Sequence, residues 1–394
     1  MTELSICVLT RDNQEICKTT ISGILRDAQL GFELLVIDAS KKYEDLKQYI
    51  DGLNDDRVRH VHVVAKDRIE HWNQAVTECK GDWITFISDS DHCDPKIVQI
   101  IRRMKNEAPD VESVGWNKVD YDWPEHRNEI RATKISLESG AFKVDKKKMQ
   151  KRFFGFEKEG LIPFNIYHGI VKRELIERIS AKFSGVYFEH PVTAYEFGYK
   201  VLAEANELAF MERPLSVISE QSEEMLSEAT VFEDIERKKS LFYKDIEVKD
   251  SLSEFPFSNA WSPKILGAVA LRWLADKYGD EFIVDGWESN FVKRREDECN
   301  AIYSAEYFDK LSTLYEKAIG NWCEGKFANE FTPRYSQRFL EQKDIVGCFH
   351  GYLFIDKNAL GAANPAEFYS ALENFIPPTS NLGLKIIEKH KKVA

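Results

Sequence analysis

Residues 69–95 read "IEHWNQAVTECKGDWITFISDSDHCDP", and this stretch decides the fold. Residues 69–80 carry the spacing of an amphipathic helix, which Gly81 ends, and residues 82–88 form a nearly continuous apolar run typical of a buried strand. Three aspartates and a histidine follow directly, before Pro95. Like charges this close repel each other unless a cation, a helix terminus or solvent compensates them. The sequence therefore predicts a buried strand that ends in an acidic turn, whose charges must be compensated by a cation, a helix terminus or solvent.

The same alternation of strand and helix extends back to the N-terminus. The expected strands cover residues 4–10, 32–38, 58–64 and 82–88, and the expected helices between them cover residues 16–25, 43–53 and 69–80. Apolar strands that alternate with amphipathic helices are typical of a mostly parallel sheet with helices on both faces. We therefore expect a Rossmann-like, doubly wound α/β domain.

Beyond the acidic turn the pattern continues with further helices and strands. Pro95 suits the first position of a helix, so Asp94 is expected as its N-cap. The later expected elements are a strand at 113–123 that leads to an edge of the sheet, helices at 169–179 and 194–205, and a last strand at 209–218. These elements would complete the sheet of the same domain.

An acidic, Ser-rich segment at residues 219–235 indicates a domain boundary. The N-terminal domain is predicted at residues 1–222, with halves at about 1–95 and 96–222. Residues 223–394 are expected to form a mainly α-helical C-terminal domain. Its expected helices cover residues 262–279, 289–304 and 305–322.

Composition and charge exclude some classes of protein. The chain has 394 residues and a net charge of −12, which disfavours non-specific binding to a nucleic-acid backbone by the chain as a whole. Its seven cysteines are scattered without a CxxC pair, as expected for reduced thiols in a cytoplasmic protein. The N-terminus lacks the pattern of a signal peptide, and the apolar stretch 265–274 is too short to span a bilayer.

Polar clusters follow each of the four expected strands, at the sheet edge where open α/β sheets bind ligands. These clusters are residues 10–13, 38–40, 66–68 and 89–91. Asp89 and Asp91 lie two positions apart in an extended turn, so both side chains can point the same way. Two carboxylates aimed at one spot suit Mg²⁺ or Mn²⁺ carrying a diphosphate. The alternatives are solvated turn aspartates and, for Asp94, a helix cap.

The segments "LSICVLTRDN" (4–13), "ELLVIDAS" (33–40), residues 71–95 and "AFMERPLSVI" (209–218) together resemble a known family. They are similar to the inverting family 2 nucleotide-sugar glycosyltransferases of GT-A fold, over about residues 1–220. The resemblance implies transfer of a hexosyl or pentosyl group from a nucleotide-diphosphate sugar, first of all a UDP-sugar, to a glycan or other hydroxyl acceptor. Residues 1–95 would then bind the donor, and residues 96–222 the acceptor.

The resemblance also implies roles for single residues. By matching position, Thr10, Asp12 and Asp38 would hold the nucleotide base. Lys66 or Arg68 would lie near the base or the diphosphate.

The acidic turn would bind Mn²⁺ or Mg²⁺ and the diphosphate through Asp89 and Asp91. Ser88 and Ser90 stand at two positions that are commonly acidic in the family, so the Asp-x-Asp of this chain is in a shifted register.

An inverting transferase also needs a general base that deprotonates the acceptor hydroxyl. In the family this base is an Asp or Glu about a hundred residues past the acidic turn, at the start of a helix. Glu196 fits that context best and Glu189 is the second candidate, while His190 could be a metal ligand or an acceptor contact. The ordinary alternative for Glu196 is a solvated helix residue.

Two other functions stay open. One is a non-catalytic GT-A-like module that binds a nucleotide or a glycan. The other is a glycosyltransferase that acts on modified nucleic acid, with phosphates held by the basic run Lys143–Arg152. That run could instead dock an anionic acceptor or the inner face of a membrane, and it could also be a solvated loop.

Overall fold

The computed structural model describes residues 2–123, 132–220, 263–302, 304–336, 346–356 and 360–379. The first part of the chain alternates strands and helices as expected. Its elements are β1 (Leu4–Thr10), α1 (Gln14–Leu25), β2 (Phe32–Asp38), α2 (Glu44–Leu53), β3 (Val58–His62), α3 (Arg68–Glu78), β4 (Trp83–Ser88), β5 (His92–Cys93) and α4 (Ile97–Glu107). The elements that follow are β6 (Val111–Asp122), β7 (Ala132–Ser136), β8 (Ala141–Val144), α5 (Lys146–Phe154), β9 (Gly169–Lys172), α6 (Arg173–Lys182), α7 (Thr193–Glu204) and β10 (Glu207–Glu220).

The main sheet has the strand order β3-β2-β1-β4-β9-β6-β10-β5, and β8 pairs with β10 outside this order. Strands β3, β2, β1 and β4 are parallel to one another. Strand β9 is antiparallel to both of its neighbours, β4 and β6. The expected doubly wound, mostly parallel sheet is thereby confirmed, and the carboxyl ends of β1 and β4 lie side by side.

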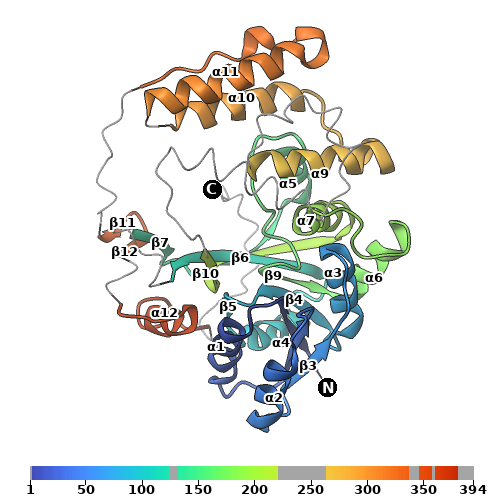
Figure 1. Cartoon of the computed structure of the whole chain (residues 1–394), viewed down its shortest axis with the longest axis vertical. Helices are drawn as coiled ribbons and strands as arrows, with labels where there is room; N and C mark the ends of the chain where they lie inside the picture. The colour runs from blue at the N-terminus through green and yellow to red at the C-terminus, as the bar shows by residue number, and fades with distance from the viewer. Residues whose placement is uncertain are drawn as a thin grey trace.

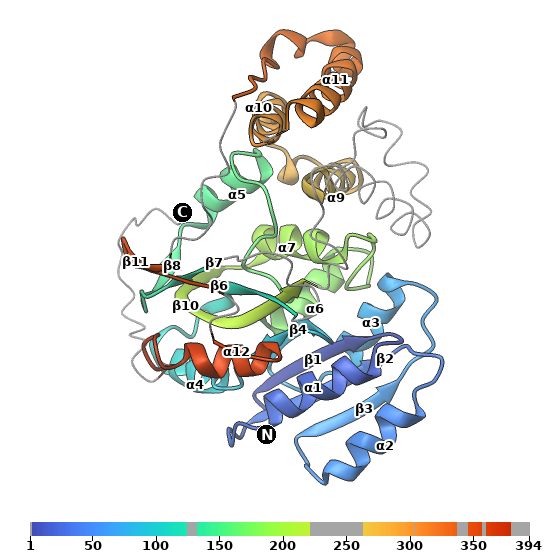
Figure 2. The same ribbon diagram turned by 60° about the vertical axis from the view of Figure 1, so that its left-hand side comes forward.

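Alternate residues of the parallel strands face two different hydrophobic cores. Leu34, Val36 and their neighbours in the sheet pack with apolar side chains of α1, α2 and α4. Leu35 and Ile37 pack on the other face, with α3, α6 and α7. Helices therefore cover both faces of the sheet, as Figures 1 and 2 show.

Three expectations about local structure are wrong. The strand expected at an edge is β6, which lies inside the sheet between β9 and β10 because later parts of the chain supply its partners. The helix expected at 169–179 begins as strand β9, and only then continues as α6. Helix α4 begins at Ile97 with Lys96 as its N-cap, although the Oδ1 of Asp94 does accept from the Lys96 backbone N–H at 2.9 Å.

Three further helices, α9 (Pro263–Tyr278), α10 (Trp287–Asn300) and α11 (Ala305–Asn321), confirm the expected helical character of the C-terminal part. They lie on the α7 side of the sheet, with α10 and α11 farthest from it (Figure 1). Helix α9 packs directly on α7. The predicted boundary near residue 222 and its acidic segment fall outside the described residues from position 221 onward, so the domain limits stay a prediction.

The last described part of the chain returns to the N-terminal unit. Strands β11 (Gly347–Phe349) and β12 (Tyr352–Asp356) form a small antiparallel sheet with β7, and α12 (Pro365–Leu372) packs on α1 and β10. The buried Tyr369 donates its hydroxyl to Asp94 Oδ2 at 2.9 Å, and Glu373 forms ion pairs with Lys96 and Arg213. Residues 346–356 and 360–376 therefore pack on the N-terminal unit and stabilise it.

Within the part of the chain that the structure describes, no helix has both the length and the apolar character that crossing a bilayer requires.

Candidate functional site

A cavity of about 480 Å³ lies at the carboxyl ends of β1 and β4. Its walls come from the ends of these two strands, the first turn of α3, the start of α7, Tyr167 and one residue of α9. The lining residues are Leu9, Thr10, Arg11, Arg68, His71, Trp72, Ile87, Ser88, Tyr167, Val192, Thr193, Ala194, Tyr195 and Leu266. We call this space the site cavity, because it lies at the sheet edge where the sequence predicts ligand binding.

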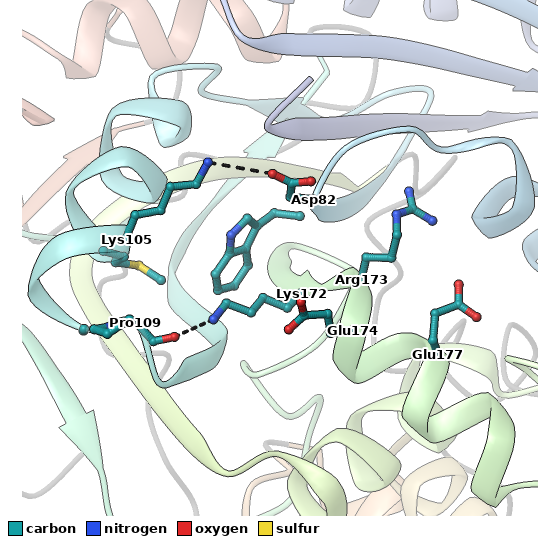
Figure 3. A pocket seen from close by; sticks show the side chains of 10 residues that line it. Asp82, Lys105, Pro109, Lys172, Arg173, Glu174 and Glu177 are labelled. Carbon is teal, nitrogen blue, oxygen red and sulfur yellow. Dashed lines mark hydrogen bonds and ion pairs between the residues drawn. The ribbon is translucent and has the colours of Figure 1, made fainter. Parts of the chain in front are cut away.

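A larger cavity of about 740 Å³ lies at the opposite end of β4, where Trp83 is one of its lining residues. Figure 3 shows this cavity. Its basic side chains are bound to the protein itself. Lys172 donates to the carbonyl of Pro109 at 2.6 Å, and Arg173 donates to the carbonyls of Gly81 and Cys79. Lys105 pairs with Asp82 at 3.7 Å. This cavity therefore offers a ligand few polar groups that are not already engaged, despite its size.

Asp89 is buried and turned toward the start of α1, and it does not line the site cavity. Its Oδ2 accepts from Thr10 Oγ1 at 2.7 Å, and its Oδ1 accepts from Asn13 Nδ2 at 2.9 Å and Ser88 Oγ at 3.3 Å. Burial raises the pKa of Asp89 to about 6, although these hydrogen bonds oppose the rise. The side chain thus ties the turn after β4 to the end of β1.

Asp91 points toward β9 and β10 instead. Its Oδ2 accepts from the Ser88 backbone N–H at 3.0 Å, from His168 Nε2 at 2.9 Å and from the Tyr167 hydroxyl at 3.2 Å. Its Oδ1 accepts from the Ser219 backbone N–H at 2.9 Å. Burial and the neighbouring Asp91 carboxylate raise the pKa of Tyr167 well above its usual value, so that hydroxyl remains a donor.

These contacts test whether a divalent cation fits the acidic turn. A cation needs carboxylate lone pairs that no other group uses, together with oxygens that converge on one point. All four oxygens of Asp89 and Asp91 accept hydrogen bonds from the protein, and the two side chains diverge. No group of three or more His, Cys, Asp or Glu side chains among the described residues could hold a metal ion. The predicted Mn²⁺ or Mg²⁺ site does not fit this geometry.

The predicted base-binding residues after β1 and β2 are placed differently from one another. Thr10 lines the site cavity, whereas Asp12 and Asp38 do not. Asp38 is fully buried, and its oxygens contact the Ser40 backbone N–H at 2.8 Å and His60 Nε2 at 3.1 Å. Burial raises the pKa of Asp38, but these hydrogen bonds outweigh burial and hold the pKa below its ordinary value. Asp12 is exposed and lies in a left-handed turn at φ 56°.

Of the two residues predicted near the diphosphate, Arg68 lines the site cavity and Lys66 does not. Arg68 is the first residue of α3, whose N-cap Asp67 accepts from the Glu70 backbone N–H at 2.8 Å.

The predicted general bases are held by cations outside the site cavity. Glu196 is fully buried, forms a 2.6 Å ion pair with Lys200 and accepts from the backbone N–H groups of Glu189 and His190. Glu189 contacts Lys200 at 2.8 Å, Lys277 at 2.5 Å and the Tyr278 hydroxyl. Burial raises the pKa of Glu189, but these donors outweigh burial and lower it to about 2. Both carboxylates are therefore engaged by protein donors, and neither of them lines the site cavity.

His190 lies beside this network. Its Nδ1 accepts from the Val192 backbone N–H at 3.2 Å, and its ring packs against Trp273 at 5.1 Å. Burial, helped by the charge of Lys200, lowers the pKa of His190 to about 4, so the ring is neutral at pH 7.

The basic run Lys143–Arg152 is largely bound to the protein. Lys143 pairs with Asp110, Lys146 donates to two backbone carbonyls at the end of α7, and Lys151 lies 3.6 Å from Glu157. Residues 146–152 of the run belong to helix α5, so the expected loop is wrong there, and the docking of an anionic partner stays a prediction.

The sequence interpretation missed several lining residues. Arg11 lies in the polar cluster 10–13 that the strand-end argument selected, but it was given no role there. Ser88 ends β4 and is the residue of the acidic turn that lines the site cavity. Tyr167 and Tyr195 come from the acceptor half, where no motif marks them.

Comparison with known proteins shows what the N-terminal part is similar to. The family model described as glycosyl transferase family 2 matches residues 5–180. These residues contain β1 to β9, most of α6 and the strand ends that border the site cavity. Residues 5–180, somewhat less than half of the chain, are thus similar to glycosyltransferase family 2.

One curated relative of the chain is the "Putative colanic acid biosynthesis glycosyl transferase WcaA" of Escherichia coli (strain K12). It is 28% identical over 106 residues, which are 26% of this chain and 38% of the relative. The chain thus spans well under half the length of that relative.

Two solved structures have a lower similarity. TarS 1–349 of S. aureus, in complex with UDP-GlcNAc, has a TM-score of 0.44 and 11% identity, over 84% of this chain and 89% of that one. The mannosyltransferase PcManGT of Pyrobaculum calidifontis, in complex with GDP-Man and Mn²⁺, has a TM-score of 0.40 and 14% identity, over 80% and 85%. The ligands named belong to those proteins.

Proposed function

We propose that the protein is a glycosyltransferase that moves a sugar from a nucleotide-diphosphate sugar to a hydroxyl acceptor, with inversion at the anomeric carbon. The acceptor oxygen forms a bond to that carbon while the bond from the carbon to the diphosphate oxygen breaks. The nucleoside diphosphate leaves, and the proton of the acceptor hydroxyl passes to a base or to solvent.

The position of the site cavity is the observation that supports this proposal. Most of its lining residues lie within the residues that match the family, and the rest come from α7, its preceding residue and α9. The cavity lies at the carboxyl ends of parallel strands, where open α/β sheets bind nucleotides. Thr10, Ser88 and Thr193 offer hydroxyls to a donor there, while Trp72 and Tyr195 offer apolar surface. The donor would enter with its diphosphate toward the strand ends and its sugar toward α7 and α9.

The proposal does not require a metal ion at Asp89 and Asp91. It also assigns no general base, and so does not rely on Glu189 or Glu196. The contacts of these four carboxylates leave each of them engaged with protein donors. Their roles in the family therefore stay predictions for this chain.

A second candidate function is a non-catalytic module that binds a nucleotide or a glycan. The observation that favours it is the lining of the site cavity, which contains no aspartate or glutamate among the described residues. Such a module would bind the same nucleotide in the same place without turnover.

A donor panel separates the two functions. The full chain is incubated with UDP-, GDP- and dTDP-sugars, with and without Mn²⁺, and released nucleoside diphosphate is measured. We expect one donor to be turned over, with the anomeric configuration of the product inverted by proton NMR. Nucleotide binding by calorimetry without release from any donor would reject the transferase and leave the binding module.

A further inference from the structure

The site cavity carries positive charge and no carboxylate. Its charged lining residues are Arg11, at the end of β1, and Arg68, at the start of α3. None of the lining residues that the structure describes is acidic. His71 adds no charge at pH 7, because burial lowers its pKa to about 4. A lining of this kind attracts an anion.

The two arginines act on the same region. Arg11, Arg68 and His71 all line the same cavity. Arg11 donates to the Ala65 carbonyl at 3.0 Å, which holds its side chain across the gap between β1 and the segment before α3. Both side chains are exposed, so a ligand can reach them. A guanidinium presents paired N–H donors that match phosphate oxygens.

The carboxylates that would hold a cation lie behind this lining and point elsewhere. Asp89 is bound by Thr10 and Asn13, and Asp91 by His168 and the Ser219 backbone. The turn residue that lines the cavity is Ser88, whose hydroxyl is a poor ligand for Mg²⁺ or Mn²⁺ compared with a carboxylate. The positive charge that a ligand phosphate would meet at this end of the sheet therefore comes from arginine side chains rather than from a metal ion.

We infer that the site cavity binds the diphosphate of a nucleoside diphosphate through Arg11 and Arg68, without a divalent cation. The inference rests on the proposed function, because it assigns the donor's leaving group to this cavity. It also deepens that function, since the two guanidinium groups would stabilise the negative charge that develops on the diphosphate as the sugar leaves.

Titration calorimetry of the full chain with UDP and with GDP tests the inference, each in excess EDTA and in Mn²⁺. The variants are Arg68→Gln, Arg11→Gln and, as a matched control, Arg102→Gln, an exposed arginine of α4 that pairs with Glu3 away from the cavity. The thermal unfolding midpoint of each variant shows that it is folded. UMP or GMP, which lacks the second phosphate, serves as the ligand control.

For the diphosphate that binds, we expect dissociation constants in EDTA and in Mn²⁺ to agree within about twofold. Arg68→Gln and Arg11→Gln should each weaken it about tenfold, as loss of a charged hydrogen bond predicts, and weaken the monophosphate much less. The Arg102→Gln control should leave binding unchanged. Binding that requires Mn²⁺, or a dissociation constant that neither arginine variant changes, would overturn the inference.

The same data distinguish this inference from the proposed function. Arginine-dependent binding in EDTA with no turnover of any donor would keep the inference and reject the transferase. Turnover that requires Mn²⁺ would keep the transferase and reject the inference. Absence of binding by either nucleotide under both conditions, together with no turnover of any donor in the panel, would reject both.

Discussion

At the scale of single residues, Glu189 is fixed by two ammonium groups and a tyrosine hydroxyl rather than by a ligand. Burial raises its pKa, but the donors Lys200, Lys277 and Tyr278 outweigh burial and lower it to about 2. A native carboxylate with a lowered pKa stabilises the fold above its unfolded pKa, and this stabilisation is lost as the pH falls toward the native pKa. Glu189 therefore links Lys200 of α7 to the end of α9 in a way that depends on pH.

The variant Glu189→Gln should lower the free energy of unfolding at pH 7, by at most about 3 kcal/mol. The difference from the parent protein should shrink between about pH 4.5 and pH 2, because the parent loses its ion pairs in that window. Urea unfolding at pH 7, 4 and 3 measures this difference.

Glu177→Gln is the control, since the exposed Glu177 contacts only the hydroxyl of Tyr187 in the contacts observed. A Glu189→Gln variant as stable as the parent at pH 7 would contradict the ion-pair account.

At the scale of elements, the packing of α9 on α7 forms the outer wall of the site cavity. A side chain at Gly267 of α9 would place its Cβ 3.1 Å from the ring of Tyr195 and 3.1 Å from the Tyr199 hydroxyl. Leu266, the residue before it, lines the cavity. The small residue at position 267 therefore lets the two helices approach closely.

Gly267→Leu should destabilise the protein by about 1–3 kcal/mol, because the added atoms must separate α9 from α7. Gly320→Ala in α11 is the comparison for a helical glycine in open space, since nothing lies within 4 Å of an added Cβ there. It should stabilise the protein by up to about 1 kcal/mol through helix propensity. Thermal and urea unfolding compare the two, and equal stability of Gly267→Leu and the parent would show that α9 does not pack here.

Elements with a clear period were predictable from sequence, whereas pairing partners were not. The four parallel strands and α7 follow from apolar patterns of adequate length. Strand β9 has only four residues and runs directly into α6, so its pattern merges with that of the helix. The interior position of β6 depends on β9 and β10, which come much later in the chain.

The same reason limits prediction of the site. Its place at the ends of β1 and β4 follows from topology, and Thr10 and Arg68 were found in this way. The orientation of Asp89 and Asp91 could not be predicted, because their partners Asn13, His168 and Ser219 lie on other elements.

At the scale of the whole molecule, the last described segments of the chain return to the N-terminal unit. Residues 346–356 and 360–376 follow the helices α9 to α11 but pack against β6, β7, β10 and α1 of the N-terminal unit. The hydroxyl of Tyr369 on the buried Asp94 is one contact that the N-terminal unit cannot replace by itself.

Deleting residues 346–394 should therefore lower the thermal unfolding midpoint by about 5 °C or more, since it exposes apolar surface and leaves Asp94 short of a donor. A shorter deletion of residues 380–394, which keeps the described contacts of α12, is the control. Scanning calorimetry measures both, and an unchanged midpoint in the longer deletion would contradict this role.

Filling each of the two cavities in turn tests the central claim most directly, namely that the cavity at the ends of β1 and β4 binds the nucleotide. Ala194→Phe places a ring in the site cavity, and Lys105→Phe places one in the cavity beside Trp83. Calorimetry with UDP and GDP should show binding lost or weakened at least tenfold in Ala194→Phe and unchanged in Lys105→Phe. The reverse result, with both variants folded, would place the nucleotide elsewhere and contradict the account.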